Sequence, residues 1–154
     1  MKQSALEFDR RNVSRTYLLL DSEAYESGEM RIAAYFSLAI KPMVFADTMS
    51  KNAIKRIDGF SKDAESVGAV VIGQLGKCAL YGNEISGSEI INNAFVPIQS
   101  VFNAVGGRIV FLECQPERKV IAFYEENGFS ALQTNGRTGL LQMVRLLKSE
   151  DSQE

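Results

Sequence analysis

The chain has 154 residues, of which 45% are hydrophobic, and it carries a net charge of −2 without a single histidine. This length supports one domain with a sizeable core and is too short for two. The lack of histidine excludes Ser-His-Asp and Cys-His nucleophilic machinery and the commonest metal ligand, so we expect no metal site. The acidic balance argues against a nucleic-acid partner, although it leaves room for a local basic patch.

Neither export nor oxidative chemistry is indicated. The apolar runs at 67–75 and 109–112 have the length of strands and fall short of the roughly 18 residues that a bilayer requires. No apolar segment follows a basic start at the N-terminus, so we expect a cytoplasmic protein without membrane contact. The two cysteines, Cys78 and Cys114, lack metal-type spacing and are expected to remain reduced thiols.

The first half of the chain predicts a short helix, two antiparallel strands joined by a polar connection, and a second helix. In order, these are residues 2–13, 15–20, 31–40 and 51–60. Lys41 and Pro42 should end the second strand, and Gly59 lies near the end of the second helix.

The second half predicts strands and helices in alternation. The nearly continuous apolar run at 67–76 is typical of a central strand covered on both faces. This strand is followed by a loop at 77–88, a long helix at 89–104 and a strand at 108–114. A short helix at 116–128, closed by Gly128, and two final strands at 129–133 and 140–147 complete the order. We therefore expect a mixed α/β fold in a single domain over 1–148, with a disordered tail at 149–154.

Three stretches carry a family resemblance. They are VVIGQLGK at 70–77, SGSEII at 86–91, and LEC at 112–114 with VIAFYEENGF at 120–129. Over residues 15–147 the chain resembles the GNAT superfamily of acyl-CoA-dependent N-acetyltransferases. The segment YFSLA at 35–39 also looks like the third strand of a subgroup that includes bacterial toxin-type acetyltransferases.

The resemblance implies a mixed sheet with antiparallel N-terminal strands and a central splayed β-α-β unit that binds acetyl-CoA as co-substrate. In the family, free backbone groups of the central strand hold the pantetheine arm, here up to Lys77. A backbone N–H of Leu75 or Gly76 would polarise the thioester carbonyl. The loop that follows would hold the pyrophosphate through Gly82, Ser86, Gly87 and Ser88.

The residues of this loop can also be interpreted without the family resemblance. A helix N-terminus with small residues around it suits a phosphate, yet the same residues suit an ordinary capped helix with Ser86 or Ser88 as N-cap. The loop departs from the family pattern Arg/Gln-x-x-Gly-x-Gly/Ala. Gly82 stands where Arg or Gln is expected, Ile85 replaces the middle glycine, and Glu84 adds negative charge. After the next strand, Glu117 stands where the family often has Asn.

Tyr124 is the predicted general acid. In the family, a helix ending Tyr-x-x-x-Gly-Phe places its tyrosine to protonate the departing CoA thiolate, and here that tyrosine is Tyr124. The alternative is a core tyrosine with its hydroxyl at the rim.

Glu113 is the nearest candidate for a general base, and its alternative is a paired structural carboxylate. Cys114 could suggest an acyl-enzyme, but a buried small side chain explains it equally.

Three functions remain open. The leading one is transfer of an acetyl group from acetyl-CoA to a primary amine by direct attack. The second is a toxin-type acetyltransferase of aminoacyl-tRNA, for which the candidate cations Arg31, Lys41, Lys51, Lys55 and Arg56 are sparse. The third is a non-catalytic CoA-binding or interaction module. The segment before the first strand is short for the family, so an uncovered strand edge and a homodimer are expected.

Overall fold

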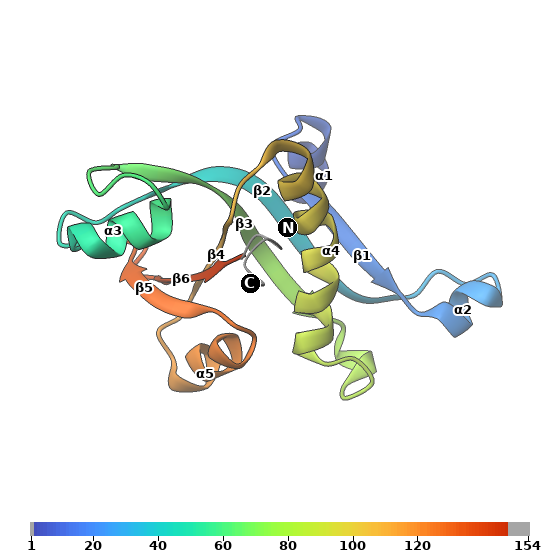
Figure 1. The fold of residues 1–154 in the computed structure, drawn as a ribbon. Coiled ribbons are helices and arrows are strands. Elements are labelled where there is room, and N and C mark those ends of the chain that lie inside the picture. The colour runs from blue at the N-terminus through green and yellow to red at the C-terminus, as the bar shows by residue number, and fades with distance from the viewer. Residues whose placement is uncertain (1, 148–154) are drawn as a thin grey trace, which may run out of the picture. The chain divides into compact units, whose positions relative to one another are not determined.

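The computed structural model describes residues 2–147, and its six strands form one sheet in the order β1-β2-β3-β4-β6-β5 (Figure 1). The chain divides into two compact units, residues 1–39 with 72–103 and residues 40–71 with 104–154. Two long strands, β2 (Ile32–Val44) and β3 (Ser66–Lys77), contribute to both units. The expected mixed α/β sheet is confirmed, whereas the domain boundary at residue 148 stays a prediction.

The first unit holds the N-terminal strands and the long helix. Its elements besides parts of β2 and β3 are α1 (Lys2–Arg10), β1 (Arg15–Leu20), α2 (Ser22–Glu26), the 3-10 turn η1 (Ala79–Tyr81) and most of α4 (Gly87–Val105). β1 pairs antiparallel with β2, and the rings of the paired residues Tyr17 and Phe36 stack at 4.9 Å. α4 buries an apolar stripe at helical spacing, made by Ile90, Ile91, Ala94 and Ile98.

The second unit holds the C-terminal strands and two shorter helices. Its elements besides parts of β2 and β3 are α3 (Lys51–Asp58), β4 (Ile109–Cys114), α5 (Arg118–Glu126), β5 (Ser130–Thr134) and β6 (Leu141–Leu146). β6 pairs antiparallel with β4 on one side and with β5 on the other. Side chains on both faces of β4 are buried, from Ile109 to Leu112, as its continuous apolar sequence predicts.

Two sequence-based expectations about the front of the chain were wrong. The connection after β1 contains the short helix α2, which Asp21 caps by accepting a hydrogen bond from the N–H of Ala24. β2 also continues through Lys41 and Pro42 to Val44. β1 pairs with β2 only as far as Leu38, so beyond that residue β2 has no β1 neighbour, and a strand tolerates proline where an edge is open.

Two further expectations concern the C-terminal tail and the absence of membrane and metal contacts. The predicted tail at 149–154 lies outside the described residues. Within residues 2–147, no helix is long and apolar enough to cross a membrane, and no cluster of acidic residues and cysteines is arranged to hold a metal ion.

Candidate active site

The segment after β3 is a tight loop tied together by a lysine from the strand end. Lys77 Nζ donates hydrogen bonds to the backbone carbonyls of Gly82 at 2.6 Å and Ile85 at 3.3 Å. Gly82 has φ +40°, a conformation that glycine adopts without steric cost. The cation therefore lies directly at the loop expected to hold the pyrophosphate.

The loop ends in a reciprocal cap at the start of α4. Glu89 N–H donates to Ser86 Oγ at 3.1 Å, and Ser86 N–H donates to Glu89 Oε2 at 2.6 Å. These bonds lower the pKa of Glu89. Ser86 is thus the N-cap, and its own N–H is occupied by a carboxylate rather than being open to a phosphate.

The next two backbone donors are open. Within the described part of the chain, no hydrogen bond engages the N–H of Gly87 or Ser88. They lie at the N-terminal end of the 19-residue helix α4, where the helix dipole favours an anion. Open donors, small side chains and a nearby lysine fit a phosphate group, while Glu89 and the exposed Glu84 oppose one.

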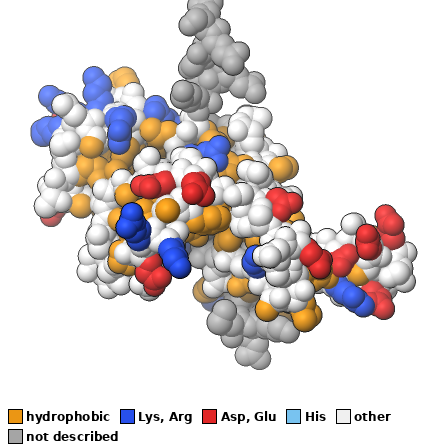
Figure 2. All heavy atoms as spheres, turned by 90° about the horizontal axis from the view of Figure 1, so that it is seen from below, with side chains coloured by type: hydrophobic (Ala, Val, Ile, Leu, Met, Phe, Trp, Pro, Cys, Tyr) orange, Lys and Arg blue, Asp and Glu red, His pale blue; other side chains and the backbone are white. Residues whose placement is uncertain are grey.

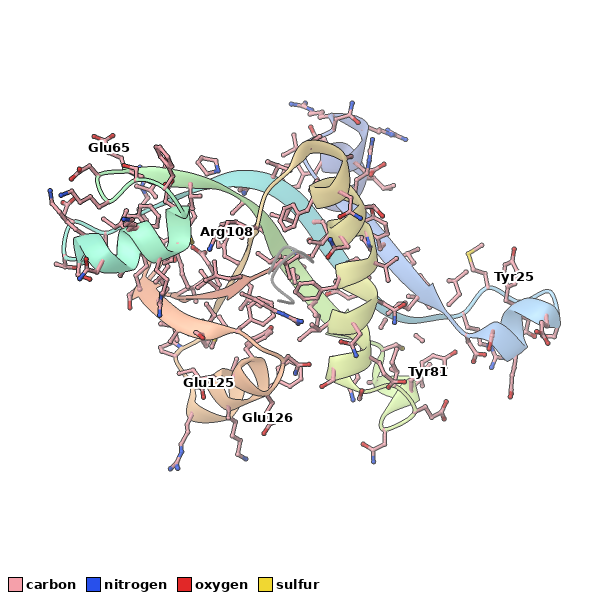
Figure 3. All side chains as sticks on the ribbon, viewed as in Figure 1. Tyr25, Glu65, Tyr81, Arg108, Glu125 and Glu126 are labelled. Carbon is pink, nitrogen blue, oxygen red and sulfur yellow. The ribbon has the colours of Figure 1, made fainter. Side chains whose placement is uncertain are left out.

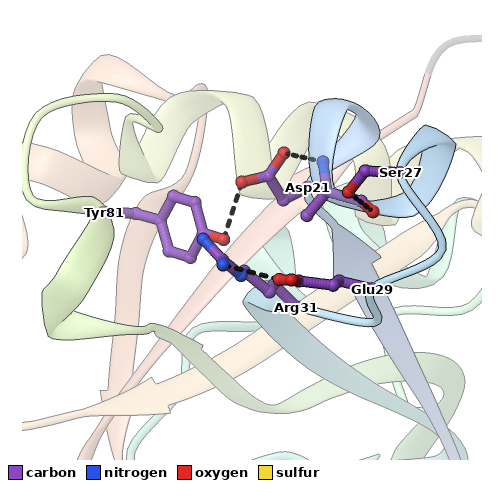
Figure 4. Close-up of polar contacts among 6 residues, drawn as sticks. Asp21, Ser27, Glu29, Arg31 and Tyr81 are labelled. Atoms are coloured by element: carbon purple, nitrogen blue, oxygen red, sulfur yellow. Dashed lines mark hydrogen bonds and ion pairs between the residues drawn. The ribbon is translucent and has the colours of Figure 1, made fainter.

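A second contact fixes the loop to α2 (Figure 4). Tyr81 O–H donates to Asp21 Oδ2 at 2.8 Å, and Asp21 also accepts from Ala24 N–H at 3.1 Å. The bond from Ala24 and then the bond from Tyr81 lower the pKa of Asp21, and the hydrogen bond to Asp21 raises the pKa of Tyr81. Sequence reasoning missed this pair, although Asp21 directly before a helix is an N-cap signal.

The end of β3 is shaped by a tyrosine from β2. A Cβ on Gly76 would lie 2.9 Å from Cε1 of Tyr35, so only glycine fits against the ring. Next to Lys77, the N–H of Cys78 donates to the carbonyl of Ala33 at 2.8 Å, and the Cys78 side chain is partly exposed. Leu75 and Gly76, the candidates for polarising a thioester, therefore lie on the strand segment beside β2.

Tyr124 lies on α5 in the second unit, half-buried between aromatic rings. Its ring meets Phe123 at 5.0 Å and Phe129 at 5.9 Å, both edge to face. Burial, and to a smaller extent the Cys114 thiol, raise the pKa of Tyr124. No hydrogen bond from residues 2–147 engages its hydroxyl, and the oxygen is not among the buried unsatisfied atoms. A protonated phenol with a free hydroxyl suits a proton donor.

The end of α5 is held by a glycine and an arginine. Gly128 has φ +82°, and Phe129 N–H donates to the carbonyl of Tyr124 at 3.0 Å. Arg145 Nη1 donates to the carbonyl of Asn127 at 3.0 Å. These bonds fix the turn of helix that carries Tyr124.

Glu113 lies on β4 directly before Cys114, so the two side chains point to opposite faces of the sheet. No hydrogen bond joins Glu113 to Tyr124 within residues 2–147. Glu113 accepts hydrogen bonds from Asn135 Nδ2 at 2.6 Å and from its cross-strand partner Gln142 at 2.8 Å. This geometry favours the structural reading of Glu113 over a base.

Cys114 is buried, and burial raises the pKa of its thiol. A raised pKa lowers the thiolate fraction, so the buried-side-chain reading of Cys114 is favoured over an acyl-enzyme.

α3 carries a local basic surface, flanked in the sequence by the acidic residues Asp47, Asp63 and Glu65. Residues 51–62 contain four Lys or Arg and one acidic residue, in a chain whose net charge is −2. Figure 2 shows Lys and Arg side chains gathered on the left, the side on which Figure 1 draws α3. Within the described residues, Lys51 pairs with Asp63 at 2.6 Å, while no ion pair engages Lys55 or Arg56.

The C-terminal end of α3 carries further charge and an exposed aromatic ring. Arg108 Nη2 donates to the carbonyl of Arg56 at 3.2 Å and packs against Gly59, which has φ +90° (Figure 3). A cation at this end of a helix is favourable for the dipole. Phe60, the next residue, is 91% exposed.

The predicted site residues thus fall into two sets. The cofactor-binding candidates Leu75, Gly76, Lys77, Gly82, Ser86, Gly87 and Ser88 belong to the first unit, and Tyr124 and Glu113 belong to the second. The structure brings together Lys77, the loop and the start of α4. It also packs the Tyr124 ring against Phe123 and Phe129.

The order of the elements and the crossover helix between neighbouring strands β3 and β4 define a GNAT-type fold. No protein-family model matches the sequence, and no curated protein sequence matches it either. Comparison with solved structures confirms the fold, through toxins of the AtaT and KacT type.

Three of these structures are representative. AtaT complexed with acetyl-methionyl-tRNAfMet has a TM-score of 0.69 and 21% identity, over 91% of this chain and 76% of that one. AtaTR bound with acetyl-CoA has a TM-score of 0.67 and 20% identity, over 92% and 76%. A tyrosine-to-phenylalanine mutant of KacT has a TM-score of 0.67 and 20% identity, over 92% and 76%. At this identity the likeness establishes the fold alone.

Proposed function

We propose that the chain is an acetyl-CoA-dependent N-acetyltransferase and that its acceptor is the amino group of an aminoacyl-tRNA. The observation that carries the enzyme proposal is Tyr124, a half-buried tyrosine with a raised pKa and a hydroxyl free of hydrogen bonds within residues 2–147. It stands on the helix where the resemblance predicts the proton donor.

The chemistry follows from the residues available. The neutral amine attacks the thioester carbonyl, whose developing charge a backbone N–H of Leu75 or Gly76 stabilises. The carbon–sulfur bond then breaks, and Tyr124 donates its proton to the leaving thiolate. Glu113 is held by two amides and is not assigned the base, so the amine must arrive unprotonated. The proton that its nitrogen loses as the amide forms passes to water, and the Tyr124 phenolate regains a proton from water.

The acceptor proposal rests on the AtaT complex with acetyl-methionyl-tRNAfMet and on the basic surface of α3. Lys55 and Arg56 have no ion pair within the described chain, so their charges are available to phosphates. Phe60, exposed beside them, offers a ring on which a base can stack. The likeness to a toxin of this kind favours aminoacyl-tRNA over a free small amine.

The test is an acetyl-transfer assay with radiolabelled acetyl-CoA. The full chain is incubated with methionyl-tRNA, a mixture of other aminoacyl-tRNAs, uncharged tRNA, or free methionine. We expect acid-precipitable label only in the reactions that contain aminoacyl-tRNA. Mild alkaline cleavage of the aminoacyl ester should release this label. Label found only on free amines would indicate a general N-acetyltransferase. Binding of acetyl-CoA without transfer to any acceptor would favour the non-catalytic module.

The basic surface has its own test. We expect the double variant Lys55→Ala with Arg56→Ala to bind tRNA more weakly and with a shallower dependence on salt, because each lost phosphate contact reduces the slope of log affinity against log salt by about 0.7–0.9. The control is Arg10→Ala with Arg11→Ala, at and just after the end of α1, which removes two cations elsewhere, one of them paired with Glu7. Equal losses in both double variants would contradict a role for α3.

A further inference from the structure

The chain leaves the described fold beside the C-terminal end of α3. Leu147, the last described residue, donates its N–H to the carbonyl of Arg108 at 2.8 Å. The side chain of the same arginine donates to the carbonyl of Arg56, in the last turn of α3, at 3.2 Å (Figure 3). All three residues belong to the second unit. The segment 148–154 therefore starts one arginine side chain away from the basic surface of α3.

This segment carries the whole net charge of the chain. Its sequence, KSEDSQE, contains one lysine and three acidic residues, Glu150, Asp151 and Glu154. The chain has 17 Lys and Arg against 19 Asp and Glu, so residues 1–147 hold 16 of each and are neutral. The net charge of −2 thus comes from the residues that begin beside α3.

The cations at this end of α3 have no bonded counter-ion in the described part of the chain. Within residues 2–147, no ion pair engages Lys55, Arg56 or Arg108, and Nε of Arg108 is buried without an acceptor. The acidic side chains nearby in the sequence are already engaged, Asp58 by two backbone N–H groups and Asp63 by the first lysine of α3. The surface therefore offers positive charge to an acidic ligand.

We propose that the acidic segment 149–154 binds the basic surface of α3 and competes there with the phosphates of nucleic acid. The inference rests on the proposed aminoacyl-tRNA acceptor and adds a regulatory contact to it. An extended residue spans about 3.3–3.6 Å, so Glu150 and Asp151 can lie up to about 10–15 Å from Leu147. The eight residues of α3 rise about 12 Å, so the segment is long enough to lie along the helix.

The tether makes a weak contact effective. An exposed ion pair contributes little by itself, but a ligand on a short flexible linker acts at an effective concentration of the order of mM. The segment therefore lowers the affinity of the surface for every nucleic acid. A ligand that makes further contacts, such as one whose aminoacyl end enters the active site, overcomes this competition more readily than one held by its phosphates alone.

The contact itself is tested without nucleic acid. A zero-length carbodiimide joins a lysine amine to a carboxylate that lies against it, and mass spectrometry identifies the linked peptides. In the full chain we expect a link between Lys55 and the segment 149–154, which bound tRNA should reduce. Lys119, an exposed lysine on α5, is the control and should not link to the segment. No link to Lys55, or equal links to both lysines, overturns the inference.

The competition is tested by the affinity for uncharged tRNA, measured by fluorescence anisotropy. We expect the triple variant Glu150→Gln, Asp151→Asn and Glu154→Gln to bind about 3–30-fold more tightly at low salt, as a few exposed ion pairs predict. The gain should shrink as salt rises. In a chain that also carries Lys55→Ala and Arg56→Ala, the same three changes should alter the affinity less than twofold, because the partners are gone.

The matched control neutralises three acidic residues in the first unit, with Glu23→Gln, Glu26→Gln and Glu29→Gln. An equal gain in this control would mean that the segment acts through net charge alone. An equal gain from neutralising the segment in the Lys55→Ala, Arg56→Ala chain would place its effect elsewhere, and either result overturns the inference.

Failure of the acceptor proposal gives a different result. If no form of the chain binds tRNA, that proposal fails and the competition fails with it, and the carbodiimide link then decides whether the contact exists. If the original chain binds tRNA and the triple variant binds it equally, only this inference fails.

Discussion

At the scale of single residues, Tyr124 combines a packed ring with a hydroxyl that has no partner among residues 2–147. Its ring is packed edge to face against Phe123 and Phe129, so its position is fixed. Its hydroxyl nevertheless has no hydrogen bond from residues 2–147. A fixed ring with a free donor is what proton transfer to a leaving group requires.

We expect Tyr124→Phe to slow acetyl transfer by at least about 100-fold, because positioned proton donors contribute about 10²–10⁴-fold. Acetyl-CoA affinity should be unchanged, since the ring and its aromatic contacts remain. Release of the CoA thiol measures the rate, and calorimetry measures the affinity. Tyr25→Phe, which alters an exposed tyrosine on α2, is the control and should be fully active. A Tyr124→Phe enzyme with normal turnover would show that the proton comes from elsewhere.

The hydrogen bond from Tyr81 to Asp21 predicts a pH dependence of stability. The folded chain holds the pKa of Asp21 below its usual 3.8, so the carboxylate stabilises the fold above that pH, and the stabilisation is lost as pH falls through the folded pKa. Removing the bond with Tyr81→Phe should lower stability at pH 7 and make less difference near pH 3. Urea unfolding at the two pH values measures this, with Tyr25→Phe as the control. A gap that stays constant with pH would mean that the bond does not favour the charged form of Asp21.

At the scale of elements, the end of α5 depends on the left-handed backbone of Gly128. A Cβ at this position would also lie 3.2 Å from Nε of Arg145. We expect Gly128→Ala to destabilise the fold by about 1–2 kcal/mol, the usual cost of this conformation for a residue with a side chain. Thermal or urea unfolding measures it.

The β5–β6 turn offers the matched control. Gly136 has no left-handed φ, and a Cβ there would meet no atom within 4 Å. Gly136→Ala should therefore be neutral or stabilising by up to about 1 kcal/mol, because alanine restricts the unfolded chain. Comparable destabilisation in both variants would contradict the conformational explanation.

Most elements could be predicted from the sequence because apolar spacing and glycine positions act locally. The stripe of α4 and the glycines after α3 and α5 had their expected consequences. The apolar run of β3 forms a strand as expected, but it is buried on both faces only at Ala69, Val70, Val71 and Ile72. The predicted end of β2 at Lys41 and Pro42 was wrong because the effect of a proline depends on where β1 stops pairing, which is a property of the neighbouring strand.

The site was less predictable for a similar reason. Whether Glu113 is free to act as a base depends on its neighbours, and two amides, from β6 and from the turn before it, both donate to its Oε1. Sequence spacing does not show these cross-strand contacts. The reach of Lys77 to Gly82 and the bond between Tyr81 and Asp21 likewise join residues that no local pattern connects.

At the scale of the whole molecule, a ligand that binds the folded chain must raise its free energy of unfolding. A ligand at about 100 times its Kd adds about 2.7 kcal/mol to the free energy of unfolding. For a chain of this size we expect acetyl-CoA to raise the Tm by roughly 5–10 °C. ATP, which has phosphates but no pantetheine arm, is the control and should give a smaller shift. An unchanged Tm with saturating acetyl-CoA would argue that the fold is retained without its cofactor.

The two cysteines differ in solvent accessibility, so a label can be attached to one of them selectively. Cys114 is sealed in the second unit, whereas Cys78 is partly accessible and directly follows Lys77. A thiol reagent applied to the native protein should therefore modify one position, next to the loop that we propose binds acetyl-CoA. A fluorophore attached there would follow occupancy of that loop in real time, with no engineered cysteine and no background from the other thiol.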